Sequence, residues 1–256
     1  MIASLGMYDR PEIAAANDAL WAGIRDRLHA RGLAAPRRLT RGEPAYWPAW
    51  TAADLVLSQT CGLPFRARLH DRVTLIGTPD YAVEGCPPGW YRSVIVARKD
   101  DPRQTEAALQ SARLIYNEPL SQSGWAAIWQ HFQDLGLCLA GGSQSGGHRL
   151  SALAVAEGRA DFAAIDAVTW RLLQRHEAFV GALHVIARTR PTPGLPLIAA
   201  QGADAATLFE CVRAAIADLD PAARHTLGVQ GLVKIPAQTY LALPIPPAPA
   251  QIDGTH

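Results

Sequence analysis

The feature that most constrains this chain is a series of short apolar runs, each about the length of one strand, that alternate with segments of helical spacing. Runs within residues 53–62, 72–81, 113–117 and 160–166 are apolar at consecutive positions rather than at every second one. Such runs are typical of strands that are covered on both faces, as in a mostly parallel sheet flanked by helices. The sequence therefore predicts the α/β class, with binding groups at the ends of the strands.

Two stretches, residues 91–102 and 183–193, resemble each other and indicate two lobes. Each consists of a β-branched strand, an arginine and a charged linker that contains proline. We interpret them as two hinge strands by which the chain crosses between lobes. Residues 92–188 then form an inserted second lobe, and residues 1–91 and 189–256 complete the first. A chain of 256 residues is long enough for two cores.

Apolar spacing and helix end signals predict the remaining elements. The opening helix has Leu20, Ile24 and Leu28 on one face, and a later helix is capped by Asp204. The proline-rich tail is expected to run over the surface in extended form. In the second lobe the predicted elements are strands at 113–117, 137–142 and 160–166, and helices at 121–134, from about 148 to 158, and at 167–175.

Charge and cysteine spacing exclude several classes of protein. The formal net charge is +1 and the pI is about 7.8, so the chain lacks the concentrated basic field of nucleic-acid binders. Cys61, Cys86, Cys138 and Cys211 are widely spaced and match no metal-ligand pattern, so neither a metal nor a cofactor is expected. We expect buried thiols, with a Cys61–Cys86 disulfide as the alternative if the protein is exported.

No apolar run is long enough to span a membrane, so the chain is not expected to be membrane-spanning. The first twelve residues, MIASLGMYDRPE, lack the basic and long apolar regions of a signal peptide. The sequence as written is therefore expected to be soluble and to carry no export signal.

The stretch NEPLSQSGWAAIW, residues 117–129, places hydroxyls and a glycine where a helix begins. The first turn of a helix has unpaired backbone N–H groups and the positive end of the helix dipole, and serine hydroxyls add donors. Gly124 permits close approach of the backbone to an oxyanion. Ser121, Gln122, Ser123 and Gly124 are therefore a candidate anion site, and the alternative is a helix N-cap without a ligand.

Two further residues are candidates near helix starts. His148 follows the flexible stretch GGSQSGG and could direct a donor imidazole toward the same site, although a satisfied surface or cap histidine is the alternative. Asp166, at the end of a predicted strand, is either a helix N-cap or an acceptor for a ligand hydrogen bond. Nucleophile and phosphate-loop motifs are missing, since Gln144 stands where a Gly-x-Ser-x-Gly serine would be, so no enzyme activity is expected.

Several stretches then occur together in one order and spacing: GWYRSVIVARKDDP, NEPLSQSGWAA, GGHRLSALAVAEGRADFAAIDAVTW and PTPGLPLI. In this combination, which covers about residues 1–243, the chain resembles the PhnD-like phosphate, phosphite and phosphonate substrate-binding proteins of ABC transporters. The resemblance implies a two-lobed periplasmic-binding-protein fold that closes on a small anionic ligand by hinge motion, without catalysis. It also implies an ABC transporter permease as partner.

The resemblance assigns residues to the ligand position by position. The Ser-x-Ser-Gly turn that holds the phosphonate oxygens corresponds here to Ser121, Gln122 and Ser123. The family's histidine corresponds to His148, and the aromatic residue before the hinge strand to Tyr91. A first-lobe tyrosine contact corresponds to Tyr46.

The sequence also departs from the family pattern. Val168 and Leu195 stand where aminoethylphosphonate binders have acidic residues for the ligand amine, so the expected ligand has no amine. The aromatic strand tip of the first lobe is replaced by SQTCG, where Gln59 and Thr60 could contact the ligand. Because the family is periplasmic and this sequence shows no signal peptide, a cytoplasmic binding or sensor protein for another small organic ligand is the alternative function.

Overall fold

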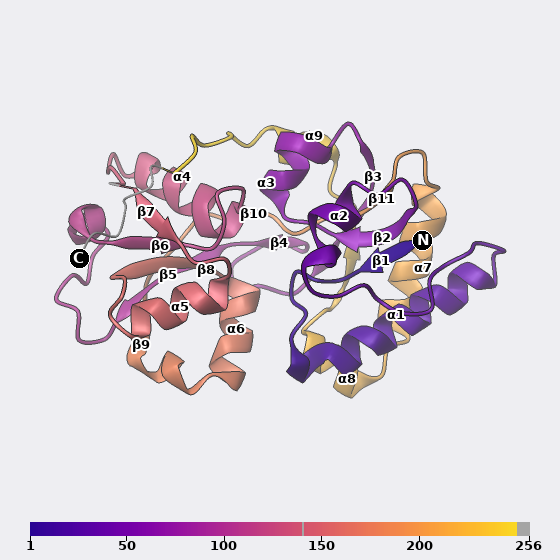
Figure 1. Cartoon of the computed structure of the whole chain (residues 1–256), viewed down its shortest axis with the longest axis horizontal. Helices are drawn as coiled ribbons and strands as arrows, with labels where there is room; N and C mark the ends of the chain where they lie inside the picture. The colour runs from indigo at the N-terminus through magenta and orange to yellow at the C-terminus, as the bar shows by residue number, and fades with distance from the viewer. Residues whose placement is uncertain (140, 250–256) are drawn as a thin grey trace. The chain divides into compact units, whose positions relative to one another are not determined.

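The computed structural model describes residues 1–139 and 141–249, and it divides the chain into two compact units (Figure 1). Unit 1 contains Met1–Trp90 and Pro193–Leu243, and unit 2 contains Tyr91–Thr192 together with residues 244–249. The chain passes from unit 1 to unit 2 at β4 (Trp90–Tyr91) and returns at β10 (Thr192–Pro193), and these two short strands pair with each other. The α/β class and the two-lobed architecture predicted from the sequence are confirmed.

Unit 1 has a five-stranded sheet in the order β1-β2-β11-β3-β12. Helices α1, α7 and α8 lie along one side of the sheet, and the shorter helices α2, α3 and α9 lie on the other (Figure 1). The strands are β1 (Ile2–Ser4), β2 (Leu55–Gln59), β3 (Val73–Asp80), β11 (Leu197–Ala200) and β12 (Gly231–Val233). The helices are α1 (Ala14–His29), α2 (Trp47–Trp50), α3 (Gly62–Pro64), α7 (Ala205–Ala217), α8 (Pro221–Leu227) and α9 (Ala237–Leu241), and η3 (Phe65–Leu69) continues α3.

Unit 2 has a second five-stranded sheet in the order β7-β6-β8-β5-β9. Helices α5 and α6 contact β5 and β8 on one side, and α4 lies on the other side (Figure 1). The strands are β5 (Ser93–Arg98), β6 (Leu114–Tyr116), β7 (Gly142–Gln144), β8 (Phe162–Asp166) and β9 (Leu183–Arg188). The helices are α4 (Ala127–Asp134), α5 (His148–Ala156) and α6 (Ala167–His176), and a π-helical turn, η5 (Gln122–Ala126), precedes α4.

The pairing of the strands is mixed, which refines the expectation of mostly parallel sheets. β1 pairs parallel with β2, and β6 pairs parallel with both β7 and β8. β5 pairs antiparallel with β8 and β9, and β11 pairs antiparallel with β2 and β3. After the first crossing the chain enters the sheet of unit 2 as β5, and after the second it enters the sheet of unit 1 as β11. Each of these strands runs antiparallel to both of its neighbours.

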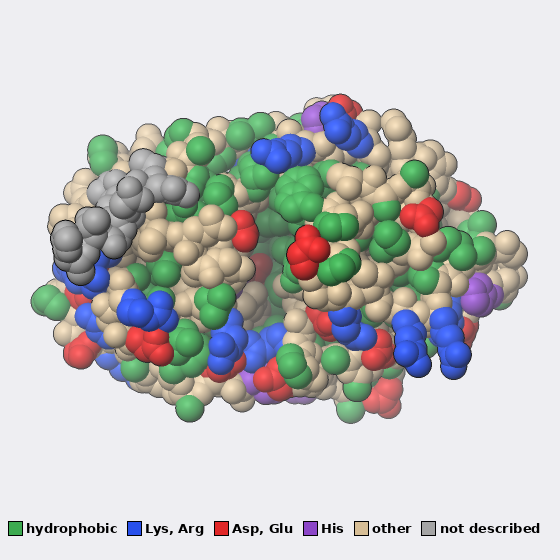
Figure 2. Space-filling view, viewed as in Figure 1, with side chains coloured by type: hydrophobic (Ala, Val, Ile, Leu, Met, Phe, Trp, Pro, Cys, Tyr) green, Lys and Arg blue, Asp and Glu red, His purple; other side chains and the backbone are tan. Residues whose placement is uncertain are grey.

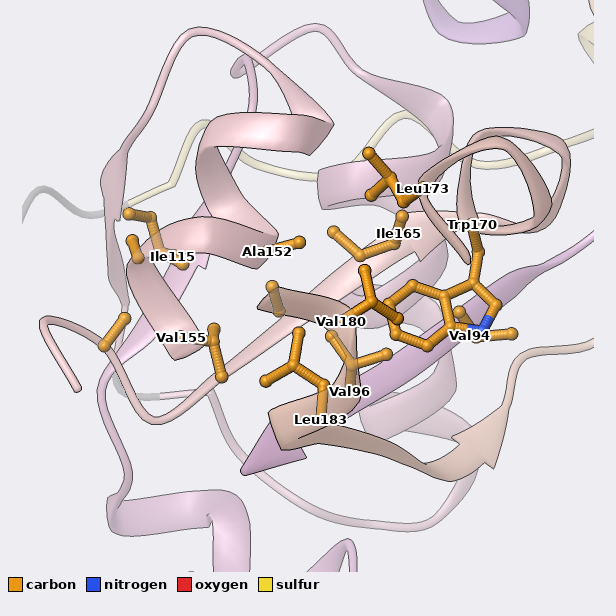
Figure 3. Close-up of a cluster of buried hydrophobic side chains, with 13 residues drawn as sticks. Val94, Val96, Ile115, Ala152, Val155, Ile165, Trp170, Leu173, Val180 and Leu183 are labelled. Carbon is orange, nitrogen blue, oxygen red and sulfur yellow. The ribbon is translucent and has the colours of Figure 1, made fainter. Parts of the chain in front are cut away.

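Strand β5 explains why an unbroken apolar run appears in the sequence. Val94 and Val96 belong to a core cluster on one face of the sheet, beneath α5 and α6, whereas Ile95 and Ala97 belong to a cluster on the other face, beneath α4. Successive side chains of a strand point to opposite faces, so a sheet that is covered on both faces needs apolar residues at every position. Figure 3 shows the first of these clusters, which includes Trp170 of α6 and Val94 of β5.

Several predicted helix signals are confirmed. Leu20, Ile24 and Leu28 form the buried face of α1. The carboxylate of Asp204 accepts hydrogen bonds from the backbone N–H groups of Ala206 and Thr207 at the start of α7. After α5, Gly158 has a left-handed φ of +74°, as a helix-terminating glycine requires.

Other expectations differ from the structure. The strand predicted at 137–142 is displaced to β7, because residues 137–139 are irregular and residue 140 lies outside the described residues. The described part of the tail, residues 244–249, belongs to unit 2 rather than to the first lobe. The indole N–H of Trp125 donates to the carbonyl of Pro247 and attaches the tail there, and the tail beyond residue 249 is outside the described residues.

The cysteines differ from the expectation of buried thiols in two cases. All four are present as thiols, so the alternative of a Cys61–Cys86 disulfide is not realised. Cys61 and Cys211 are buried, but Cys86 is half-buried and Cys138 is exposed. Among the described helices, none is long and apolar enough to cross a membrane.

A network of charged side chains stabilises the edge of unit 2. The buried carboxylate of Asp161 accepts hydrogen bonds from the guanidinium groups of Arg103 and Arg113, at 3.0 and 2.9 Å, and from the backbone N–H of Arg113. Burial alone would raise the pKa of Asp161, but the hydrogen bonds from Arg113 and Arg103 outweigh it and hold that pKa well below its usual range. The ionised carboxylate therefore contributes to the stability of unit 2.

We predict that Asp161→Asn lowers the free energy of unfolding at pH 7 by roughly 2 kcal/mol, because Arg113, which is largely solvated, then has a neutral partner and Arg103 keeps only Asp101. A group with a depressed folded pKa stabilises above its unfolded pKa of about 3.9 and loses that contribution as the pH falls further. The difference between variant and wild type, measured by urea unfolding, should therefore shrink below pH 4. Asp100→Asn, at an exposed carboxylate, is the control and should change little.

Candidate functional site

The turn between β6 and α4 in unit 2 places the Ser121–Gly124 stretch at the beginning of a long helical segment. Ser121 is the N-cap, and its hydroxyl oxygen accepts a hydrogen bond from the backbone N–H of Gly124 at 2.9 Å. The carbonyl of Ser121 accepts from the N–H groups of Trp125 and Ala126, which makes the first turn a π-turn. Among the described residues, no group accepts a hydrogen bond from the backbone N–H of Ser123. The predicted N-cap is present, and a donor remains available beside it.

Gly124 is required at its position by the close approach of Asn117. A Cβ atom on Gly124 would lie 1.8 Å from Asn117 Oδ1 and 3.3 Å from His148 Cε1. Asn117 Oδ1 is buried and has no hydrogen-bond partner among the described residues. Asn117 was not among the candidates from sequence, although its position directly after a predicted strand could have indicated it.

Ser123 and His148 are brought together although 25 residues separate them in the chain. The Ser123 hydroxyl lies 2.7 Å from His148 Nε2, which is a short hydrogen bond. His148 is the first residue of α5, so the contact joins the N-terminal turns of two helices. The structure thus brings His148 to the Ser121–Gly124 turn, as the sequence predicted.

The imidazole of His148 is neutral at physiological pH. Burial lowers the pKa of His148 to about 4, and a contact with the backbone carbonyl of Ala164 offsets part of that effect. Because the four residues of the turn include no lysine or arginine, its positive potential comes from the helix N-terminus and its N–H groups. The turn offers hydrogen-bond donors without a formal charge.

Ser93 and Asp166 lie behind the turn at the end of the sheet. They are directly opposite each other in the register of β5 and β8. The Ser93 hydroxyl donates to the carbonyl of Ser123 at 2.8 Å, so Ser93, which sequence reasoning missed, orients the turn. The Asp166 carboxylate accepts from the N–H groups of Val168 and Thr169 at 2.7 and 3.0 Å, which is the N-cap role that the sequence offered as one alternative. Tyr91, at the start of unit 2, is buried.

The first-lobe candidates are all in unit 1. Tyr46 is partly exposed, with its hydroxyl donating to the carbonyl of Gly6 at 2.9 Å. Gln59, at the end of β2, donates from Nε2 to the carbonyl of Leu195 at 3.3 Å, and the carbonyl of Gln59 accepts from the indole of Trp50. Thr60 is fully buried, and its hydroxyl has no hydrogen-bond partner among the described residues.

Acidic and basic side chains alternate on the surface. On the face shown in Figure 2, lysine and arginine side chains lie beside aspartate and glutamate rather than forming one basic field. Among the described residues, no group of three His, Cys, Asp or Glu side chains is placed to hold a metal ion.

Two α/β units joined by two crossings, with an uncharged helix N-terminal turn rich in donors, define a solute-binding protein of the periplasmic-binding-protein class. Residues 52–240 match the family described as "ABC transporter, phosphonate, periplasmic substrate-binding protein". The match covers well over half of the chain, so the protein belongs to this family.

Several solved structures have the same fold, among them the following three. PhnD1 from Prochlorococcus marinus, solved with methylphosphonate, has a TM-score of 0.69 at 15% identity, and the alignment covers 93% of this chain and 94% of that one. XAC2383 from Xanthomonas citri, solved with chloride and with ATP, has a TM-score of 0.66 at 16% identity, with 94% of each chain covered.

The third is a binding protein component of an ABC phosphonate transporter from Pseudomonas aeruginosa. It has a TM-score of 0.65 at 15% identity, covering 91% of this chain and 80% of that one. At these identities the likeness concerns the fold. A comparison with curated proteins finds no match.

The lowered pKa of His148 makes stability depend on pH. Unfolded histidine binds a proton below about pH 6.5, but His148 in the folded protein does so only near pH 4. Stability should therefore fall by about 2–3 kcal/mol as the pH drops from 6.5 to 4. Imidazole NMR should give a His148 midpoint near 4, and His148→Asn should flatten the pH dependence of urea unfolding. A His148 midpoint near 6.5 would contradict the buried, neutral ring.

A methyl group at Gly124 should disturb the turn. We predict that Gly124→Ala costs about 1–3 kcal/mol of stability, because Asn117 must move to make room. Adding Asn117→Ala should restore part of the loss, since the clashing oxygen is then removed. Gly181→Ala is the control, because a Cβ there meets no atom within 4 Å. Thermal unfolding of the three variants and the wild type measures these differences.

Proposed function

We propose that this protein captures a small phosphorus oxyanion, such as phosphite, a phosphonate or phosphate, for ABC-type transport. The observation that carries the proposal is the Ser121–Gly124 turn, where a helix N-terminus offers an untaken N–H from Ser123 beside two serine hydroxyls. An oxyanion at such a site gains both the hydrogen bonds and the helix dipole. Membership of the phosphonate-binding family supports the same ligand class.

The hydrogen bonds around the turn leave donors for a ligand. The Ser121 oxygen accepts from Gly124 N–H, so the hydroxyl proton of Ser121 is available to donate. If His148 donates from Nε2 to the Ser123 oxygen, the Ser123 proton is available as well. Together with the backbone N–H of Ser123, these groups match the several acceptor oxygens of one oxyanion.

The ligand proposed here has no amine. Val168 and Leu195, at the positions where the resemblance places acidic residues in aminoethylphosphonate binders, are buried apolar side chains. An ammonium group beside them would lose water without gaining a partner, which is costly. We therefore favour phosphite, methylphosphonate or phosphate over aminoethylphosphonate.

The remaining candidates keep secondary roles in this proposal. Gln122 and Gly124 supply backbone at the turn, and Asp166, as the cap of α6, fixes the chain near Ser93. Tyr91 and the unit 1 residues Tyr46, Gln59 and Thr60 are proposed as further ligand contacts. We also propose that the protein works in the periplasm, with hinge motion at the two crossings and a permease as partner.

We propose binding without catalysis. The distance from Ser123 Oγ to His148 Nε2, 2.7 Å, is within the range of a nucleophile and its base. However, the other ring nitrogen, Nδ1, is buried and has no hydrogen-bond partner among the described residues, so no carboxylate orients the ring or stabilises its charge. Release of phosphate from any phosphonate by the purified protein would overturn this part of the proposal.

Calorimetry with phosphite, methylphosphonate, phosphate, aminoethylphosphonate and sulfate tests the ligand class. We expect saturable binding of at least one of the first three, and weaker or no binding of aminoethylphosphonate. Failure of all five to bind would contradict the oxyanion proposal.

Ser123→Ala tests the position of the site. Removal of one hydrogen bond to a charged ligand costs about 1.5–3 kcal/mol, so the affinity for the best ligand should fall about 10- to 150-fold. Ser143→Ala changes an exposed serine in β7 and is the matched control, with no effect expected. Equal affinities of wild type and Ser123→Ala would place the ligand elsewhere.

A further inference from the structure

Unit 1 contains a cavity that the oxyanion turn of unit 2 does not use. Its volume is about 30 Å³, and it lies between the sheet and the layer of α1, α7 and α8. The sheet contributes residues from its inner strands, among them Leu57 and Gln59 of β2 and Leu197 at the start of β11. A volume of this size exceeds the roughly 10–15 Å³ that one water needs.

Most of the cavity wall is aliphatic. Leu20 and Ile24 of α1 and Val212 and Ile216 of α7 form the helix side. None of the lining residues is an acid, a lysine, an arginine or a histidine. An ion would lose its hydration at such a wall without compensation, so the cavity favours a neutral occupant.

Two buried amide side chains give the cavity a polar side, which Tyr8 and Tyr81 also line. Gln59 Nε2 faces the carbonyl of Leu195, which can only accept, and this fixes the orientation of the amide. Asn17 Nδ2 likewise donates to the carboxylate of Asp9 at 2.8 Å. Gln59 and Asn17 are 3% and 6% exposed, and no donor among the described residues reaches the side-chain oxygen of either. Both oxygens are therefore acceptors that lack a donor.

We propose that this cavity binds a small neutral aliphatic molecule, or the end of a larger one, that carries a single O–H or N–H donor. The donor serves the amide oxygens of Gln59 and Asn17, and the alkyl part lies against Leu20, Ile24 and Val212. Water could reach the polar groups, but it would leave the larger apolar part of the wall without contacts, which an alkyl group fills. The residues that line the cavity all belong to unit 1, and among them Gln59 is also proposed as a contact of the oxyanion.

The experiment compares ethanol with acetonitrile, which has the same number of heavy atoms but no donor. Each is titrated into the full chain with labelled Ile, Leu and Val methyl groups. We expect saturable NMR shifts at the methyl groups of Ile24, Leu20 and Val212. Ethanol should bind about 2- to 12-fold more tightly than acetonitrile, because one hydrogen bond changes the affinity by about that factor. Unsaturable shifts, or equal affinities for the two probes, would overturn the proposal.

Variants test the place of binding. Val212→Ile adds one methylene to the wall, and Leu20→Phe fills more of the cavity, so ethanol affinity should fall in both and further in the second. Val185→Ile, a similar change in the unit 2 core, is the control and should leave the affinity unchanged. Thermal unfolding verifies that each variant is folded. If Leu20→Phe does not fold, the ethanol affinity of Val212→Ile alone tests the site. Unchanged affinity in a folded cavity variant, or ordered waters alone in a crystal soaked with ethanol, would refute the site.

Discussion

Coverage of each sheet on both faces is the constraint on which the arrangement of this protein depends. In β8 all five residues are buried, and the side chains of neighbouring β5 alternate between two core clusters. A polar side chain within such a strand would need a partner inside the core. The polar groups therefore gather where the strands end, as Asn117 does after β6 and Asp166 does at the end of β8. The position of the candidate site follows from the burial of the sheet.

The chemistry of the site depends on orientation more than on charge. Ser93 holds the carbonyl of Ser123, Ser121 caps the helix, and His148 remains neutral beside the serine hydroxyl. The proposed oxyanion would be held by fixed dipoles, because the four residues of the turn include no lysine or arginine. Donors in fixed directions would distinguish ligands by the arrangement of their oxygens as well as by charge.

The sequence was informative where local pattern and fold agree. The buried face of α1, the cap at Asp204 and the helix start at Ser121 follow from spacing and end signals that involve only a few neighbouring residues. The meeting of Ser123 with His148 was suggested by glycine-rich surroundings and by the family resemblance rather than by spacing. The roles of Ser93 and Asn117 were missed, because they depend on strand register and on a close approach to Gly124 that no local pattern reveals.

The strand directions were also beyond local pattern. The sequence of an apolar strand is the same whether the strand runs parallel or antiparallel to its neighbours. The antiparallel direction of β5 and β11 could therefore not be predicted from their sequences. The tail was assigned to the first lobe, whereas residues 244–249 belong to unit 2, where the indole of Trp125 donates to the carbonyl of Pro247. Long-range contacts of this kind are set by the assembled fold.

The position of β11 between β2 and β3 has a consequence for synthesis. When the first ninety residues leave the ribosome, the facing edges of β2 and β3 have no strand between them, because Leu197–Ala200 is made only after all of β5–β9. Unit 2 has its complete sheet by then, whereas the first sheet is still open at its centre. Open strand edges pair readily with other chains. The nascent protein therefore exposes an aggregation-prone edge for as long as the ribosome takes to translate an entire domain.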